Sequence, residues 1–153
     1  MIKGDKQLQN NIKLLHIKCN QNIFYERLFQ YVLVKQRYFD LEDVEWMRKF
    51  TNHSNKRISI YCITILCAKG ISIKEFHNLI EENKEDSFWS LKIIDIAEKQ
   101  KSPETLLFYL DENGKFINRA ILSLKRIKQE SYLTTLLLSD TPLAKTISKI
   151  VDL

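Results

Sequence analysis

The residues of this chain that could bind a metal or act in catalysis are few and widely spaced. His16 and Cys19 lie three residues apart and could share a helix face, as metal ligands do, but no second pair of ligands follows at a suitable spacing. We therefore expect a partly buried pair and no metal site. Cys62 and Cys67 would lie about 140° apart around a helix and cannot bind one ion together. We expect both to pack as small apolar groups.

No arrangement typical of an active site appears either. His53 and His77 have no nucleophile near them, and the chain contains no phosphate-binding loop, dinucleotide fingerprint, serine-hydrolase elbow or zincin motif. The acidic pairs at 81–82 and 111–112 could be paired carboxylates for acid–base chemistry, but both fall where solvated turns are expected. The sequence predicts no catalytic residues and no cofactor, and favours a protein that is not an enzyme.

The composition of the chain indicates one all-α domain. Its 153 residues are 44% hydrophobic and 28% charged, an ordinary balance for a globular protein. Only 3 glycines and 2 prolines are present, too few for a β-sandwich or barrel with many turns. The three cysteines lack the spacing of a disulfide framework, and the longest uncharged run, residues 58–68, is too short to cross a bilayer. We expect a cytoplasmic protein with no membrane segment.

Four residues suited to a helix N-cap recur along the chain, spaced 32, 30 and 29 residues apart: Asp40, Ser72, Ser102 and Ser131. Each has a side-chain oxygen that can accept a hydrogen bond from a free N–H at the start of a helix. The residues four and seven places further on share one helix face and form an apolar stripe that we expect in one continuous core. This stripe consists of Val44, Met47, Phe76, Leu79, Leu106, Tyr109 and Leu138.

A longer helix is predicted after each of these short ones, and two more helices before them. The predicted long helices cover residues 55–69, 87–100, 115–129 and 142–151, and the two earlier ones cover 5–19 and 21–37. The clearest repeats of a short and a long helix are residues 40–71, 72–101, 102–130 and 131–153. Residues 58–66 are rich in isoleucine and could instead form a strand, but Gly70 after the segment and the length of the segment favour a buried helix.

This alternation resembles the HEAT-like repeats, particularly the short bacterial kind. The closest stretch, residues 106–114, reads LLFYLDENG, and the turn recurs with a proline at 136–142, which reads LLLSDTP. The apolar positions that follow the first stretch also match, at Phe116, Ala120 and Leu124. The sequence departs from the family at Ile117, where many such repeats place an arginine, and no ladder of Asp and Arg between repeats is visible. The resemblance is best over 72–153 and implies a right-handed stack of about five helical hairpins, an α-solenoid, used as a binding scaffold.

The N-terminal part of the chain is basic. The net charge is +5, and residues 1–70 hold 12 of the 24 Lys and Arg but only 6 of the 19 Asp and Glu. A cluster of basic residues interleaved with aromatic ones falls within residues 35–57: Lys35, Arg37, Arg48, Lys49, His53, Lys56 and Arg57. Lys56 and Arg57 would begin a helix, where cations are mildly unfavourable unless an anion is bound. The acidic residues at 40–45 offer the alternative that the cluster is neutralised locally.

Leu122 is the most distinctive residue of the predicted helix 115–129. It points away from the apolar face of that helix and is surrounded within one turn by long polar side chains, those of Asn118, Arg119, Lys125 and Arg126. An apolar residue ringed in this way resembles the centre of a protein–protein hot spot. Single exposed leucines are also common, and a neighbouring helix could cover this one.

These features favour a non-enzymatic protein-binding module, meaning an adaptor, an accessory subunit or an inhibitor of the immunity-protein type. Leu122 and the polar residues around it are its predicted contact surface. The alternative is a nucleic-acid-binding protein that uses the basic residues of segment 35–57.

Overall fold

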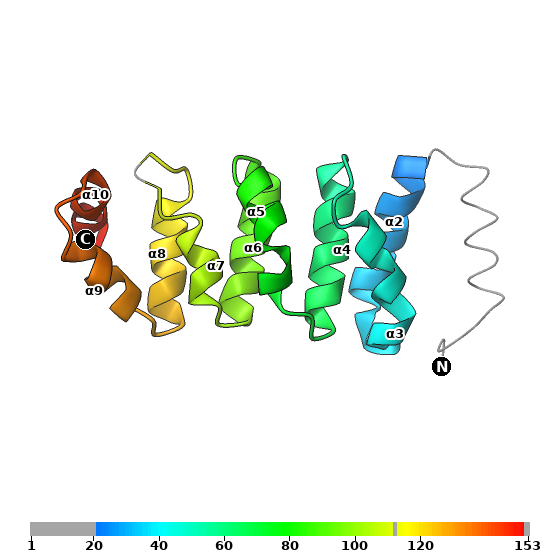
Figure 1. Ribbon diagram of the computed structural model, residues 1–153. Coiled ribbons are helices and arrows are strands. Elements are labelled where there is room, and N and C mark those ends of the chain that lie inside the picture. The colour runs from blue at the N-terminus through cyan, green and yellow to red at the C-terminus, as the bar shows by residue number, and fades with distance from the viewer. Residues whose placement is uncertain (1–20, 112, 152–153) are drawn as a thin grey trace. The chain divides into compact units, whose positions relative to one another are not determined.

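The computed structural model of the chain describes residues 21–111 and 113–151, and these are helical without any strand (Figure 1). In chain order the elements are α2 (Gln21–Val34), η1 (Gln36–Tyr38), α3 (Leu41–Val44), η2 (Glu45–Phe50), α4 (Lys56–Ala68), η3 (Ile73–Phe76), α5 (His77–Asn83), α6 (Ser87–Lys99), α7 (Pro103–Leu107), α8 (Ile117–Arg126), α9 (Ser131–Leu137) and α10 (Pro142–Val151). The all-α prediction is confirmed, and segment 58–66 lies in a helix. The helix predicted at 5–19, with His16 and Cys19, lies outside the described residues.

The chain divides into two compact units after Ile71. Unit 1 ends with residue 71 and is described from residue 21, and unit 2 comprises residues 72–153. The division coincides with the predicted boundary between repeats 40–71 and 72–101. None of the helices in the described part of the chain is long and apolar enough to span a membrane.

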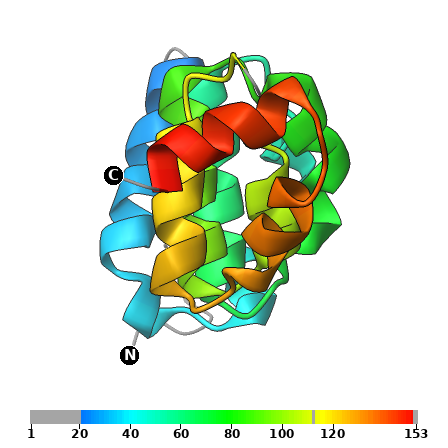
Figure 2. The same ribbon diagram turned by 90° about the vertical axis from the view of Figure 1, so that its left-hand side faces the viewer.

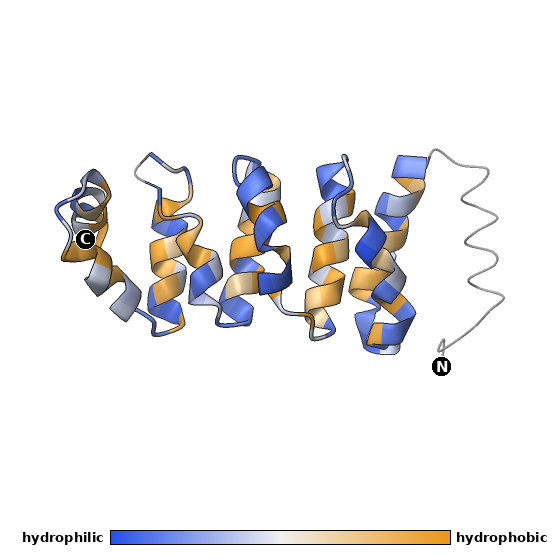
Figure 3. Cartoon of the chain, in the orientation of Figure 1, coloured by the Kyte–Doolittle hydropathy of each residue, from blue (hydrophilic) through white to orange (hydrophobic). Residues whose placement is uncertain are grey.

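Unit 1 is built around α4, which packs against α2 and η2. The isoleucines and leucine of α4 are fully buried, and hydrophobic residues run along this helix in Figure 3. The side chain of Asn55 caps its start by accepting a hydrogen bond from the backbone N–H of Arg57 at 3.0 Å. A second hydrogen bond, from the hydroxyl of Ser59 to the carbonyl oxygen of Thr51, ties the first turn of α4 to the end of η2.

Unit 2 is built around α6, which packs against α5, α7 and α8. Trp89, Ile93 and Ile94 of α6 are fully buried. The side chain of Gln100, just after α6, accepts a hydrogen bond from the backbone N–H of Ile73 at 2.8 Å, so the first N–H of η3 has a partner. At the other end of the unit α10 contacts both α9 and α8, as the view in Figure 2 shows.

Three of the long helices, α4, α6 and α8, end in the same way. The residue just past each C-cap has a positive φ: 103° at Gly70, 52° at Lys101 and 59° at Lys128. The next residue then donates its N–H back into the last turn, in the pattern of a Schellman motif. These bonds join Ile71 to Leu66 (3.1 Å), Ser102 to Ala97 (2.9 Å) and Gln129 to Leu124 (2.9 Å). The glycine predicted to end α4 does so, and lysines take its place in α6 and α8.

The predicted starts of the short helices hold at three of four positions. Asp40 precedes α3, and its N–H donates to the carboxylate of Asp43 at 2.8 Å. Ser72 precedes η3 and accepts the N–H of Lys74 at 3.3 Å, and Ser102 precedes α7. The prediction is wrong at Ser131, which is the first residue of α9 and not its cap.

The predicted core stripe is buried except at two positions. Val44, Met47, Phe76, Leu106 and Tyr109 are buried, and Leu79 is half-buried. The prediction is wrong for Leu138, which is 86% exposed at the C-cap of α9. Leu133 is buried in its place. The two leucines are five residues apart and point about 140° from each other around a helix, so only one of them can face the core.

Candidate interaction surfaces

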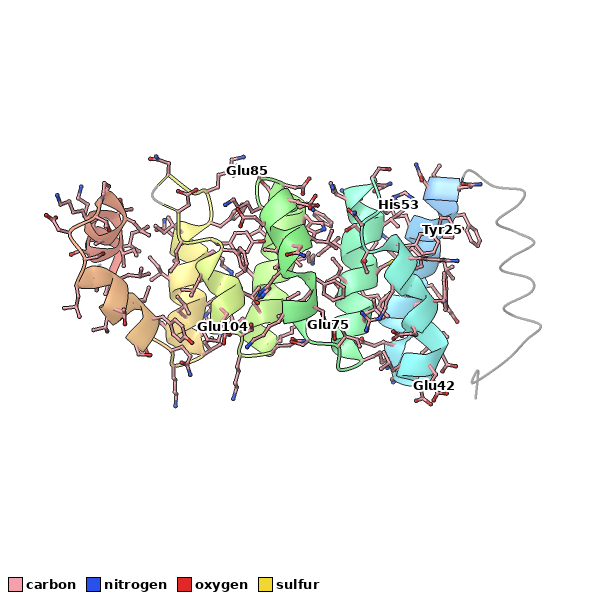
Figure 4. All side chains as sticks on the ribbon, viewed as in Figure 1. Tyr25, Glu42, His53, Glu75, Glu85 and Glu104 are labelled. Atoms are coloured by element: carbon pink, nitrogen blue, oxygen red, sulfur yellow. The ribbon has the colours of Figure 1, made fainter. Side chains whose placement is uncertain are left out.

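The basic residues of segment 35–57 separate into groups at different places on unit 1. Lys69, which follows α4, donates from its Nζ to the carbonyl oxygen of Gln36, so Lys35 and Arg37 lie at the C-terminal end of α4. Lys56 and Arg57 form the N-terminal end of the same helix, about 20 Å away at 1.5 Å per residue. Figure 4 labels one residue near each group in the sequence, Glu42 after Arg37 and His53 before Lys56, and these two lie at opposite ends of this unit.

Several of these cations have partners within unit 1. Arg37 lies over the ring of Tyr38, with its guanidinium carbon 4.7 Å from the ring centroid. The Nε of Arg48 forms an ion pair with Glu45, one of the acidic residues at 40–45 that were expected, as an alternative, to neutralise the cluster. Lys56 and Arg57 begin α4 in a first turn that contains no acidic residue.

An aromatic cluster between α2 and η2 was not foreseen from the sequence. Phe50 is its centre, with ring centroids 4.5 Å from Tyr25, 5.5 Å from Phe29 and 5.9 Å from Trp46. The Nζ of Lys49 lies 5.2 Å from the ring of Phe50 and 5.7 Å from that of Trp46. Trp46 is nevertheless 40% exposed. A signal was present in the sequence, because both aromatic pairs, 25/29 and 46/50, are spaced by one helical turn.

Leu122 is 44% exposed on α8, so no helix of the described chain covers it fully. Two of the residues predicted around it make ion pairs with α6. Arg119 reaches Asp95 at 2.8 Å and Glu98 at 3.0 Å, and Arg126 reaches Glu98 at 3.4 Å. The other two residues predicted around Leu122 differ in exposure, Asn118 being exposed and Lys125 half-buried.

The ion pairs form one connected network between consecutive long helices. Glu98 also accepts the hydroxyl of Ser123 at 2.7 Å. Burial alone would raise the pKa of Glu98, but the hydrogen bond from Ser123 and the charges of Arg119 and Arg126 outweigh it and hold this pKa below its usual range. For Arg119, burial acts to lower the pKa, but the hydrogen bond to Asp95 and the charge of Glu98 raise it. An Asp–Arg pair thus links α6 to α8, two residues beyond the position at which the resemblance places an arginine.

A groove of about 510 Å³ lies in unit 2 and was also not foreseen. We call it the α7 groove, and its lining comes from α5, α7, α10 and the turns beside them: Glu81, Lys84, Glu104, Leu107, Phe108, Leu110, Asp111 and Leu143. In Figure 4 Glu104 lies near the lower end of unit 2, and Glu85, next to Lys84, lies near its upper end. Both acidic pairs read from the sequence contribute a residue to the groove, through Glu81 and Asp111.

His77 fixes one wall of this groove. Its Nε2 lies 2.9 Å from the hydroxyl of Thr105, and its ring meets the ring of Phe108 edge to face at 4.9 Å. Burial lowers the pKa of His77, the charge of Lys74 lowers it further, and Glu104 partly opposes both. The neutral imidazole is therefore the form that the fold favours.

The two cysteines of the described chain lie in α4. Cys62 and Cys67 are buried there, as expected, and burial raises the pKa of Cys62. Within residues 21–111 and 113–151, no group of three or more His, Cys, Asp or Glu side chains is placed to hold a metal ion.

Comparison with known proteins does not identify a family for this chain. The chain matches no protein-family model, no curated protein and no solved structure.

Proposed function

We propose that the protein is a non-enzymatic protein-binding module, an adaptor, an accessory subunit or an inhibitor of a specific partner. Its architecture would be that of the HEAT-like repeats, a right-handed stack of about five helical hairpins. The common ending of α4, α6 and α8 supports this proposal, because helices that occupy equivalent places in a repeat are expected to end alike.

The observation that carries the proposal is the exposed Leu122 between two arginines held in place by α6. Arg119 and Arg126 lie three residues before and four residues after Leu122, so all three share one face of α8. Their ion pairs to Asp95 and Glu98 restrict both guanidinium groups before any partner arrives. Side chains that are already ordered lose less entropy on binding, which favours a specific contact.

A second exposed leucine extends this surface. Leu91 is 43% exposed on α6 and lies one turn before Asp95, on the same face of that helix. Because Asp95 bonds to Arg119, the two leucines flank one ion-paired patch that spans α6 and α8. We name this patch, formed by Leu91, Asp95, Arg119 and Leu122, the leucine surface.

The test is a comparison of Leu122→Ser with Leu138→Ser, a matched change at an exposed leucine outside the leucine surface. Both variants should keep the thermal stability of the wild type, since neither leucine is a core residue. Only Leu122→Ser should lose a partner in quantitative affinity capture, with binding weakened by more than about 1 kcal/mol. A core-sized loss of stability in Leu122→Ser, or equal partner recovery with both variants, contradicts the proposal.

Nucleic-acid binding by unit 1 is the second candidate, and exposed Trp46 beside Lys49 favours it. An exposed indole can stack on a base while a neighbouring ammonium group contacts phosphate. Affinity would then fall with salt by roughly one logarithmic unit per phosphate contacted, for each logarithmic unit of salt. Reversal to Glu of Arg48, Lys49, Lys56 and Arg57 should abolish binding to single- and double-stranded oligonucleotides. Absence of binding at low salt would exclude this candidate.

A further inference from the structure

The floor of the α7 groove is apolar and belongs to no surface described under the proposed function. Leu107, Phe108 and Leu143 are half-buried there, and Leu110 is almost fully buried. The volume of about 510 Å³ lies within the range of natural binding clefts. The exposed parts of these side chains can therefore pack against an apolar side chain of a partner.

The floor is held in place by contacts within unit 2. The ring of Phe108 is held by the edge of His77, and His77 is held by Thr105. Leu107 belongs to α7, whose buried neighbour Leu106 anchors that helix in the core of unit 2. A preformed site of this kind costs little ordering on binding.

The rim of the groove carries an excess of negative charge. Three carboxylates line the groove, from Glu81, Glu104 and Asp111, together with the ammonium group of Lys84, and the Nζ of Lys74, outside the lining, pairs with Glu104 at 3.0 Å. Lys84 itself is bound by Glu81 at 2.8 Å, and the negative charges of Asp111 and Glu85 also raise its pKa. Glu81 and Glu104 are thus each paired with a lysine, and Asp111 leaves the rim with one carboxylate in excess, which favours a cation over a polyanion.

We propose that the α7 groove binds a short segment of a partner protein that combines leucine-like side chains with lysine or arginine. The apolar side chains would enter the floor between α7 and α10, and the cations would lie against Glu81, Glu104 and Asp111. The inference rests on the proposed function in taking a protein as the partner. Its site is separate, because no residue of the leucine surface lines the groove.

The experiment measures binding of a fluorescein-labelled leucine–lysine peptide of about four helical turns to the full chain by anisotropy. A peptide with glutamate at every lysine position is the matched control ligand. The groove variant Glu81→Gln/Asp111→Asn is compared with Glu42→Gln/Glu130→Gln, which removes two carboxylates outside the groove. Leu107→Ser tests the floor. Circular dichroism, and the emission of the buried Trp89 in a Trp46→Phe background, confirm that each variant is folded.

The leucine–lysine peptide should bind about tenfold more tightly than its glutamate counterpart. The groove double variant should weaken it by about fivefold to tenfold, Leu107→Ser by a similar factor, and the control double variant by less than about twofold. Equal weakening by the two double variants, or no effect of Leu107→Ser in a folded protein, would overturn the proposal. Leu122→Ser should bind this peptide like the wild type, so failure of the groove and failure of the leucine surface are distinguishable.

Discussion

The helix ends at Lys101 and Lys128 predict an unusual gain of stability from glycine. Both lysines are exposed and have φ values of 52° and 59°, close to the left-handed helical minimum. An L-residue other than glycine costs about 1–2 kcal/mol in this conformation. Glycine avoids that cost but loses about 0.5–1 kcal/mol more conformational entropy on folding. Lys101→Gly and Lys128→Gly should therefore each stabilise unit 2 by about 0.5–1 kcal/mol.

Gly70 provides the opposite change in the same motif. A Cβ added at Gly70 meets no atom within 4 Å, so Gly70→Ala adds no clash and tests the backbone alone, at a φ of 103°. This variant should destabilise unit 1 by about 1 kcal/mol.

Urea unfolding followed by circular dichroism measures the effect of Gly70→Ala, and tryptophan fluorescence measures the two lysine-to-glycine changes in unit 2. The chain has two tryptophans, the exposed Trp46 in unit 1 and the buried Trp89 in unit 2, so a Trp46→Phe background leaves a single reporter of unit 2. With a slope of about 2 kcal/mol per molar urea, each lysine-to-glycine change should raise the midpoint by about 0.25–0.5 M. An unchanged or lowered midpoint would refute the Schellman endings of α6 and α8.

Three further predictions concern the core and the titrating groups of unit 2. Leu106→Ala should cost about 2–5 kcal/mol in urea unfolding because Leu106 is fully buried, and Leu79→Ala should cost less because Leu79 is half-buried. Because the pKa of His77 is lowered in the folded state, the unfolded state binds a proton more readily. The free energy of unfolding should therefore fall as pH decreases below about 6.5. His77→Gln should remove this part of the pH dependence, as measured by unfolding curves at several pH values. The lowered pKa of Glu98 has its stabilising effect above the ordinary Glu value of about 4.3, and the effect is lost as pH falls through the folded pKa. A carboxyl-carbon NMR titration of Glu98 with a midpoint at or above the ordinary value would contradict the ion-pair network.

The sequence predicts the helices correctly where the signals lie within one helix and the residues at its ends. Gly70 and the length of the segment predict the helix α4 correctly despite the β propensity of its isoleucines. At α9 the prediction failed because the helix ends at Leu137, so Leu138 lies at its exposed C-cap, and Leu133 occupies the core. The positive φ at the ends of α6 and α8 could not be predicted, because lysine, unlike glycine, carries no preference for that conformation.

The surfaces were harder to predict because they depend on contacts between distant residues. The exposure of Leu122 followed from the period of α8, but its ion-paired surroundings join Arg119 to Asp95, 24 residues earlier. The α7 groove is assembled from residues between Glu81 and Leu143, and no spacing within one helix indicates it. The basic segment 35–57 shows the converse, because residues close in sequence are carried to opposite ends of α4.

The most direct test of the protein-binding proposal is site-specific photo-crosslinking from position 122. A photoreactive phenylalanine analogue is placed at Leu122 and, as control, at Leu138, and the two proteins are irradiated in the cell and analysed by mass spectrometry. We expect a partner that crosslinks from position 122 and not from 138, and whose crosslinking is competed by excess unlabelled wild-type protein but not by Leu122→Ser. Equal crosslinking from both positions, or equal competition by Leu122→Ser, would contradict the proposal that the leucine surface binds a partner.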